Sequence, residues 1–217
     1  MATESAATKA ISRAARDVLR PMGLTQKGRS RTWLDDHGWW AVVVEFQPLG
    51  YSPGSYLNVG ACWLWQPQTE DASLHFDEGH RIQRSFTTFE SEEQFAEAAT
   101  ALAVSAADEV RALRRRFAAP SDALGHLEDR HRNAGPDIRV EWNLAMALAL
   151  AGRHEEARAI ARRDQPAGAY EWVVNLQREL ARLGPMSDDE LRASVRANIA
   201  ATRTSLGRGQ WDASFER

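Results

Sequence analysis

Hydrophobic positions follow two different periods in the first part of the chain. Between residues 5 and 20 they recur every three or four positions, which predicts an amphipathic helix that Pro21 and Gly23 end. Three segments rich in valine, tryptophan and other strand-forming residues then predict β-strands at 29–34, 39–47 and 55–65. Apolar and polar residues alternate in the third segment, so one face of that strand should be apolar. A weaker fourth strand is predicted at 81–86.

Polar segments separate these strands. Asp36, His37 and Gly38 predict a turn between the first two strands. Two prolines and two glycines predict a loop at 48–54, and the acidic segment 66–80 predicts a second loop.

A long helix is predicted after the sheet. Ser91 and Gln94 have the spacing of a capping box, and an apolar stripe with helical spacing extends from there to Phe117. A composition shift at 118–120 places a domain boundary there. The expected fold class is therefore α+β: an antiparallel three- or four-stranded sheet flanked by the N-terminal helix and the long helix.

The chain beyond the boundary contains helix formers and no strand pattern. Helices are predicted at 136–151, 154–163 and 169–183, and a further helix is predicted after the capping box that begins at Ser187. The sequence thus predicts two regions, an α+β sheet domain at 1–118 and an all-α C-terminal region at 119–217 packed as an extension of it.

Composition and charge restrict the possible classes of function. The 27 basic and 30 acidic residues give a net charge of -3, which argues against general attraction to nucleic acid or anionic lipid. The single cysteine, Cys62, cannot form an internal disulfide, which favours a reducing compartment. No signal peptide or long apolar segment is visible, so a cytoplasmic protein without a membrane span is expected. No cofactor is expected.

Residues of the first region resemble a bacterial family. The order of helix, Gly-Leu-x-x-Lys-Gly, apolar strand, proline-glycine loop and Tyr-Leu-Asn-Val-Gly resembles the domain of unknown function 4304 family over residues 5–118. The matching residues are Gly23, Leu24, Lys27, Gly28, Trp33, Phe46, Gln47, Tyr56, Leu57, Asn58, Val59 and Gly60. The resemblance implies no established reaction. Similar small domains are often encountered around bacterial toxin and immunity gene clusters, so it implies an immunity-like role.

A second, local resemblance lies in the helical region. Residues 143–157, with small side chains at Ala145 and Ala157, resemble the centre of a tetratricopeptide hairpin spanning about 138–163. A single such hairpin cannot bury its own hydrophobic face, so it is expected to pack on flanking helices or on the sheet domain.

The tryptophans are the most unusual feature of the composition. Five of the eight fall within 33–65, where they could line a binding face or fill the core. Trp39 and Trp40 are consecutive, so in a regular strand they would point to opposite faces. Core packing is the simpler explanation for any single tryptophan.

Polar residues within the apolar strands are the other candidates for function. Glu45, Gln47 and Asn58 require hydrogen-bond partners if they are buried. Gln47 and Asn58 flank the predicted loop, so they are expected to pin it or, as the alternative, to contact a ligand. The candidate binding residues are Trp39, Trp40, Gln47, Tyr51, Asn58, Trp63 and Trp65.

Catalytic motifs are missing from the sequence. His75, Asp77 and His80 lie close together but match no zinc spacing, and no nucleophile elbow, phosphate loop or dinucleotide fingerprint occurs. The sequence therefore favours a binding or interaction protein with a protein partner over an enzyme. The alternative is a small-molecule-binding or hydrolase-like protein with a pocket near Glu45 and the 75–80 segment. The oligomeric state stays open.

Overall fold

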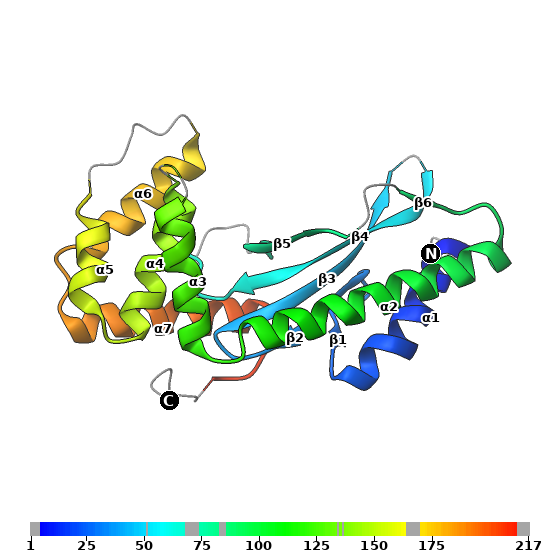
Figure 1. The fold of residues 1–217 in the computed structure, drawn as a ribbon, viewed down its shortest axis with the longest axis horizontal. Coiled ribbons are helices and arrows are strands. Elements are labelled where there is room, and N and C mark those ends of the chain that lie inside the picture. Colours follow the sequence, from blue (N-terminus) through cyan, green and yellow to red (C-terminus); the bar gives the residue numbers. More distant parts are fainter. Residues whose placement is uncertain are drawn as a thin grey trace. The chain divides into compact units, whose positions relative to one another are not determined.

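The chain divides into two compact units in a computed structural model (Figure 1). Unit 1 contains Met1–Trp63 and Leu74–Arg115, and unit 2 contains Leu64–Ser73 and Arg116–Arg217. The structure describes residues 5–50, 52–67, 74–82, 86–133, 135, 137–163 and 170–211.

Unit 1 is built on an antiparallel sheet in the order β1-β2-β3-β4-β5, with β6 also paired to β4. The strands are β1 (Thr25–Gln26), β2 (Thr32–Asp36), β3 (Trp40–Leu49), β4 (Ser52–Trp63), β5 (Glu78–Arg81) and β6 (Thr87–Thr88). The predicted α+β class with an antiparallel sheet is confirmed. The strand number was underestimated, because β1 and β6 contain two residues each and are too short to show a hydrophobic period.

The segment 48–54, predicted as a loop, mostly belongs to a hairpin. β3 continues to Leu49 and β4 begins at Ser52, and these two residues are paired. The register shifts between Gln47 and Leu49, which places Pro48 at an irregularity of the ladder. Proline is tolerated there because a bulge needs no donor from that residue, so proline content alone gave the wrong loop boundaries.

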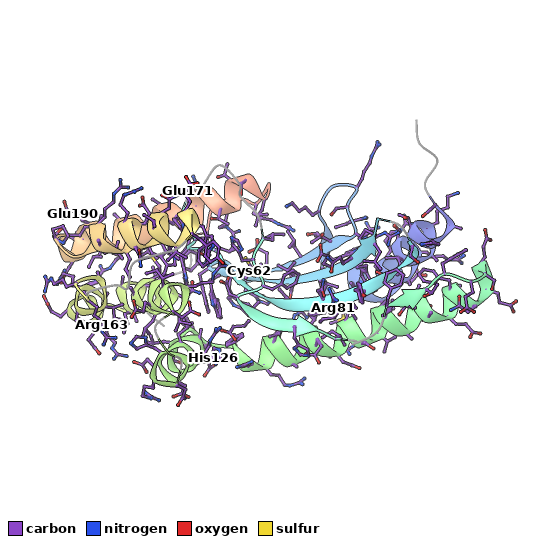
Figure 2. All side chains as sticks on the ribbon, turned by 90° about the horizontal axis from the view of Figure 1, so that it is seen from above. Cys62, Arg81, His126, Arg163, Glu171 and Glu190 are labelled. Carbon is purple, nitrogen blue, oxygen red and sulfur yellow. The ribbon has the colours of Figure 1, made fainter. Side chains whose placement is uncertain are left out.

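The expected helices of unit 1 are present. α1 (Ala6–Leu19) begins at Ser5, whose side chain accepts a hydrogen bond from Thr8 N, and a short 3-10 helix, η1 (Arg20–Met22), follows it. α2 (Glu92–Arg116) begins after Ser91, whose hydroxyl accepts from Gln94 N. The reciprocal bond differs from the predicted capping box, because the Gln94 side chain accepts from Glu90 N. Figure 2 shows α2 running beside the sheet.

Side-chain alternation gives the sheet two different faces. One row of β3 holds Trp40, Val42, Val44 and Phe46, and all four side chains are buried. Asp35 on β2 pairs with Val42 and bonds Arg114 of α2, so this row belongs to the face that α2 covers. The other row of β3 contains Glu45 and Gln47, which are half-buried. The same strands therefore supply a helix-covered face and a partly open face.

Unit 2 is helical in its described part. Its helices are α3 (Pro120–Asn133), α4 (Ile138–Leu150), α5 (His154–Ala161), α6 (Glu171–Leu183) and α7 (Asp188–Ser205). α4 is buried along nearly its whole length, which explains its hydrophobic composition. The capping box predicted at Ser187 is present, with reciprocal bonds between Ser187 and Glu190. No helix in the described part of the chain is long and apolar enough to cross a membrane.

Candidate functional site

A polar group crosses three strands on the partly open face of the sheet. It consists of Glu45, Gln47, Tyr56, Asn58 and Arg81, and we call it the sheet platform. Register brings these residues together, because Glu45 pairs with Asn58, Gln47 pairs with Tyr56, and Asn58 also pairs with Arg81. Paired residues point to the same face of an antiparallel sheet, so all five side chains lie on one side.

Asn58 occupies the centre of the sheet platform. Its Nδ2 donates to Glu45 Oε2 and to Gln47 Oε1, each at 3.0 Å. Its Oδ1 accepts a hydrogen bond from Arg81 Nε at 3.3 Å. The Asn58 amide therefore links an acid on β3 to a base on β5.

Arg81 is held by three neighbours at the edge of the platform. Besides its bond to Asn58, it donates from Nη2 to Gln47 Oε1 at 3.0 Å. Its guanidinium carbon lies 3.8 Å from the centre of the Tyr56 ring, and Tyr56 meets the Phe86 ring edge-on at 5.0 Å. The side chain of Arg81 is nevertheless exposed, so an ordered positive group faces solvent.

The backbone of β4 and β5 approaches closely beside this site. Gly60 and Gly79 are paired, and a Cβ added at Gly60 would lie 2.4 Å from the carbonyl oxygen of Glu78. A side chain at either position would push β5 away from β4. These glycines therefore fix the distance between Asn58 and Arg81, which lie two residues away on the same strands.

The sequence-predicted roles of Gln47 and Asn58 differ from what the structure shows. Both were expected to pin the predicted loop at 48–54, whereas their side chains bond across the strands to each other, to Glu45 and to Arg81. The reason is that the predicted loop is a continuing hairpin, whose backbone groups are paired within the ladder. Tyr51, also a predicted binding residue, lies outside the described residues.

Three of the candidate tryptophans form a buried cluster in unit 1. The rings of Trp39 and Trp63 stack with centres 5.6 Å apart, and Trp40 lies within 6.3 Å of both. Trp39 and Trp40 were expected on opposite faces. They share one cluster because Trp39 precedes β3, where strand alternation does not apply. All three side chains are buried, so this cluster belongs to the core.

A buried carboxylate lies beside the tryptophan cluster. Asp35 accepts hydrogen bonds from Arg114 Nε and from His37 Nε2, both at 2.7 Å, and the His37 ring stacks on Trp40. Burial alone would raise the pKa of Asp35, but the hydrogen bonds from His37 and Arg114 outweigh it and hold the pKa at about 2. Asp35 thus stays ionised and ties α2 to the sheet.

Trp65, the remaining tryptophan candidate, belongs to unit 2. β4 ends at Trp63, so Trp65 does not continue the apolar face of that strand as the alternation predicted. Its Nε1 donates to Asn143 Oδ1 on α4 at 3.0 Å, and Asn198 of α7 bonds its carbonyl oxygen. The Trp65 side chain is fully buried, which makes it an anchor of the helical unit.

The residues of the alternative, hydrolase-like site do not converge. Glu45 bonds Asn58 within the platform, whereas Asp77 Oδ2 accepts the backbone N–H of Trp63. His80 pairs with Val59, which places it on the opposite face from Glu45. Among the residues that the structure describes, no group of three His, Cys, Asp or Glu side chains could hold a metal ion.

Cys62 is buried in the same strand that carries the platform. Burial raises the pKa of its thiol strongly, and the nearby charge of Asp77 adds to that increase. A protonated, inaccessible thiol is a poor nucleophile, so Cys62 acts as a small core residue.

Comparisons with known proteins give no relative. A scan of protein-family models, a search of curated proteins and a search of solved structures each find no match to this chain.

Arg81 and Tyr56 are the platform residues that the sequence did not select as site candidates. Arg81 was assigned to a weak strand at 81–86, while β5 covers Glu78–Arg81. The pairing of Arg81 with Asn58 depends on a register across a chain separation of 23 residues. No local sequence pattern reports that register, so the sequence contained no signal that would bring Arg81 to Asn58.

Proposed function

We propose that this protein is a binding protein whose sheet platform contacts a protein partner. The observation that supports it best is the ordered, exposed Arg81 guanidinium on the partly open face of the sheet. Arginine and tyrosine are enriched among residues that dominate interface energies, and a pre-ordered side chain loses little entropy on binding.

In this proposal the buried tryptophans have a structural role. Trp39, Trp40 and Trp63 pack in the core, so they hold the strands that present the platform and are not themselves contact residues. The hydrolase-like alternative lacks support from geometry, because Glu45 and His80 lie on opposite faces of the sheet. The net charge of -3 favours a protein over a nucleic acid as the partner.

The cellular context is part of the same proposal. The resemblance of residues 5–118 to the domain of unknown function 4304 family supports an immunity-like role in bacteria, in which the partner would be a toxin. A single buried cysteine fits a cytoplasmic location for such a protein.

Site-specific photo-crosslinking tests the proposal. A photoreactive amino acid is placed at Thr32, which pairs with Glu45 at the margin of the platform, and in a second sample at Val104, which is exposed on α2. We expect a crosslinked protein from position 32 and none from position 104 after irradiation in extracts of the source cells. Equal crosslinking from both positions, or none from position 32, would contradict the proposed binding face.

A further inference from the structure

The hydrogen bonds of Arg81 leave one side of its guanidinium open. A guanidinium is planar and carries five N–H donors in a fixed fork geometry. The bonds to Asn58 and Gln47 come from Nε and Nη2, which together form one edge of the plane. Among the described residues, Nη1 has no hydrogen bond, so the edge formed by Nη1 and Nη2 still presents two parallel donors.

The open edge is also fixed in direction. The Tyr56 ring covers one face of the guanidinium at 3.8 Å, and two amide oxygens hold the bonded edge. Free arginine side chains usually lose rotamer entropy when they bind. Here the protein has already restricted Arg81, so a ligand would find its two donors in place.

We infer that the open edge of Arg81 binds the carboxylate of an aspartate or glutamate side chain in an acidic segment of the partner protein. This inference rests on the proposed function and adds the chemistry of the partner. A carboxylate matches two parallel N–H donors in a bidentate pair, which is both stronger and more directional than a single bond. Capture of a chain terminus would instead need a nest of free backbone N–H groups, whereas β4 uses its own groups in pairing.

Glu45 indicates a second chemical group that the partner segment should carry. It lies two strands from Arg81, and both side chains bond to Asn58. Its Oε2 accepts from Asn58, and Oε1 remains able to accept an N–H from a ligand. The complementary segment therefore carries a carboxylate for Arg81 and an N–H donor that reaches Glu45. A phosphate is disfavoured because such groups are normally bound by several arginines, and the platform combines one arginine with an acid.

Peptide selection tests this inference with the whole chain. Short random peptides are selected on the wild type, on Arg81→Gln and on Arg111→Gln, a matched control that removes an exposed arginine paired with Asp108 on α2. We expect aspartate or glutamate at one dominant position for the wild type and the control, and loss of that preference for Arg81→Gln. Thermal melting of each variant verifies that it is folded.

The selected peptide is then measured by fluorescence anisotropy against two derivatives. Replacing its acidic residue by the corresponding amide should weaken binding about thirtyfold, and Arg81→Gln should weaken it equally, because each change removes the same bidentate pair. Arg81→Lys should recover only part of the affinity, since an ammonium group lacks the fork. A phosphoserine derivative should bind no more tightly than the acidic peptide.

The outcomes separate the inference from the proposed function. Peptides that depend on Arg81 but contain no acidic residue, or that bind tighter with phosphoserine, would overturn the carboxylate inference and leave the platform as a binding face. Selected peptides that bind Arg81→Gln as tightly as the wild type would also overturn the inference. The proposed function itself fails if the crosslink from position 32 is missing or if position 104 crosslinks equally.

Discussion

The two faces of the sheet in unit 1 use the same strands for different purposes. On the helix-covered face, consecutive inward positions of β3 are tryptophan, valine, valine and phenylalanine, and all are buried. On the platform face, the intervening positions include Glu45 and Gln47, whose side chains bond to neighbouring strands. If the platform binds a partner as proposed, substitutions on the helix-covered face should mainly reduce stability, and substitutions of platform residues should mainly reduce binding.

The largest loss of stability is expected from Trp63→Ala on the helix-covered face. The Trp63 side chain is fully buried and stacks on Trp39, so its removal leaves a large cavity. Denaturant unfolding should show a loss of about 3–5 kcal/mol. The matched control, Trp172→Ala, removes a half-exposed ring of α6 and should lose less than about 1 kcal/mol. Equal losses would contradict the assignment of Trp63 to the core.

Asp35→Asn should cause the next largest loss of unfolding free energy. It should also change how that free energy depends on pH in the acid range. The variant removes a buried ionised group from between Arg114 and His37, at a cost of about 3 kcal/mol in unfolding free energy. The pKa of Asp35 is about 2 in the folded protein and 3.8 ordinarily, so its contribution is present above pH 3.8 and is lost as the pH falls towards 2.

Unfolding curves between pH 7 and pH 2 measure this contribution. The wild type should lose about 2 kcal/mol more than Asp35→Asn over the acid range. Asp108→Asn serves as the control, since that carboxylate is exposed on α2 and pairs with the exposed Arg111. Parallel acid profiles for the wild type and Asp35→Asn would contradict the role of Asp35.

Gly60→Ala should reduce both stability and peptide affinity, because it disturbs the spacing of β4 and β5. The new Cβ would lie 2.4 Å from the backbone oxygen of Glu78, so β5 must move at a cost of about 1–3 kcal/mol. Since Arg81 is on β5, affinity for the selected peptide should also fall. Gly125→Ala on α3, where an added Cβ has free space, should leave stability unchanged or slightly raised. Unaltered peptide affinity in a destabilised Gly60→Ala would argue that β5 does not position the ligand.

Arg81→Gln should reduce peptide binding with little loss of stability, whereas Trp63→Ala is expected to reduce stability strongly. Arg81 is exposed, so the variant should lose less than about 1 kcal/mol in unfolding free energy while it loses peptide binding. Chemical denaturation and anisotropy on the same preparation measure both quantities. A loss of stability comparable to that of Asp35→Asn would show that the platform is a structural network and would remove the distinction between the two faces.

Local sequence patterns predicted the elements of this fold better than they predicted its site. Hydrophobic period and capping residues identified α1, α2, α7 and the two long strands, because these signals come from neighbours along the chain. Trp39 and Trp65 were placed less well, since each lies just outside a strand where alternation no longer holds. The platform needed the pairing of Asn58 with Arg81, a long-range register that no single-sequence pattern reports.

Glu45→Gln is the mildest change and tests how far the platform extends. The amide keeps the shape of the side chain and can still accept an N–H, so unfolding free energy should change by less than about 0.5 kcal/mol. Loss of the charge weakens the bond that Oε1 would accept, so affinity for the selected peptide should fall about fivefold. Glu97→Gln, on the exposed side of α2, is the control and should change neither quantity. If Glu45→Gln binds as tightly as the wild type while Arg81→Gln does not, recognition is confined to Arg81, and the N–H donor expected opposite Glu45 is not part of the partner surface.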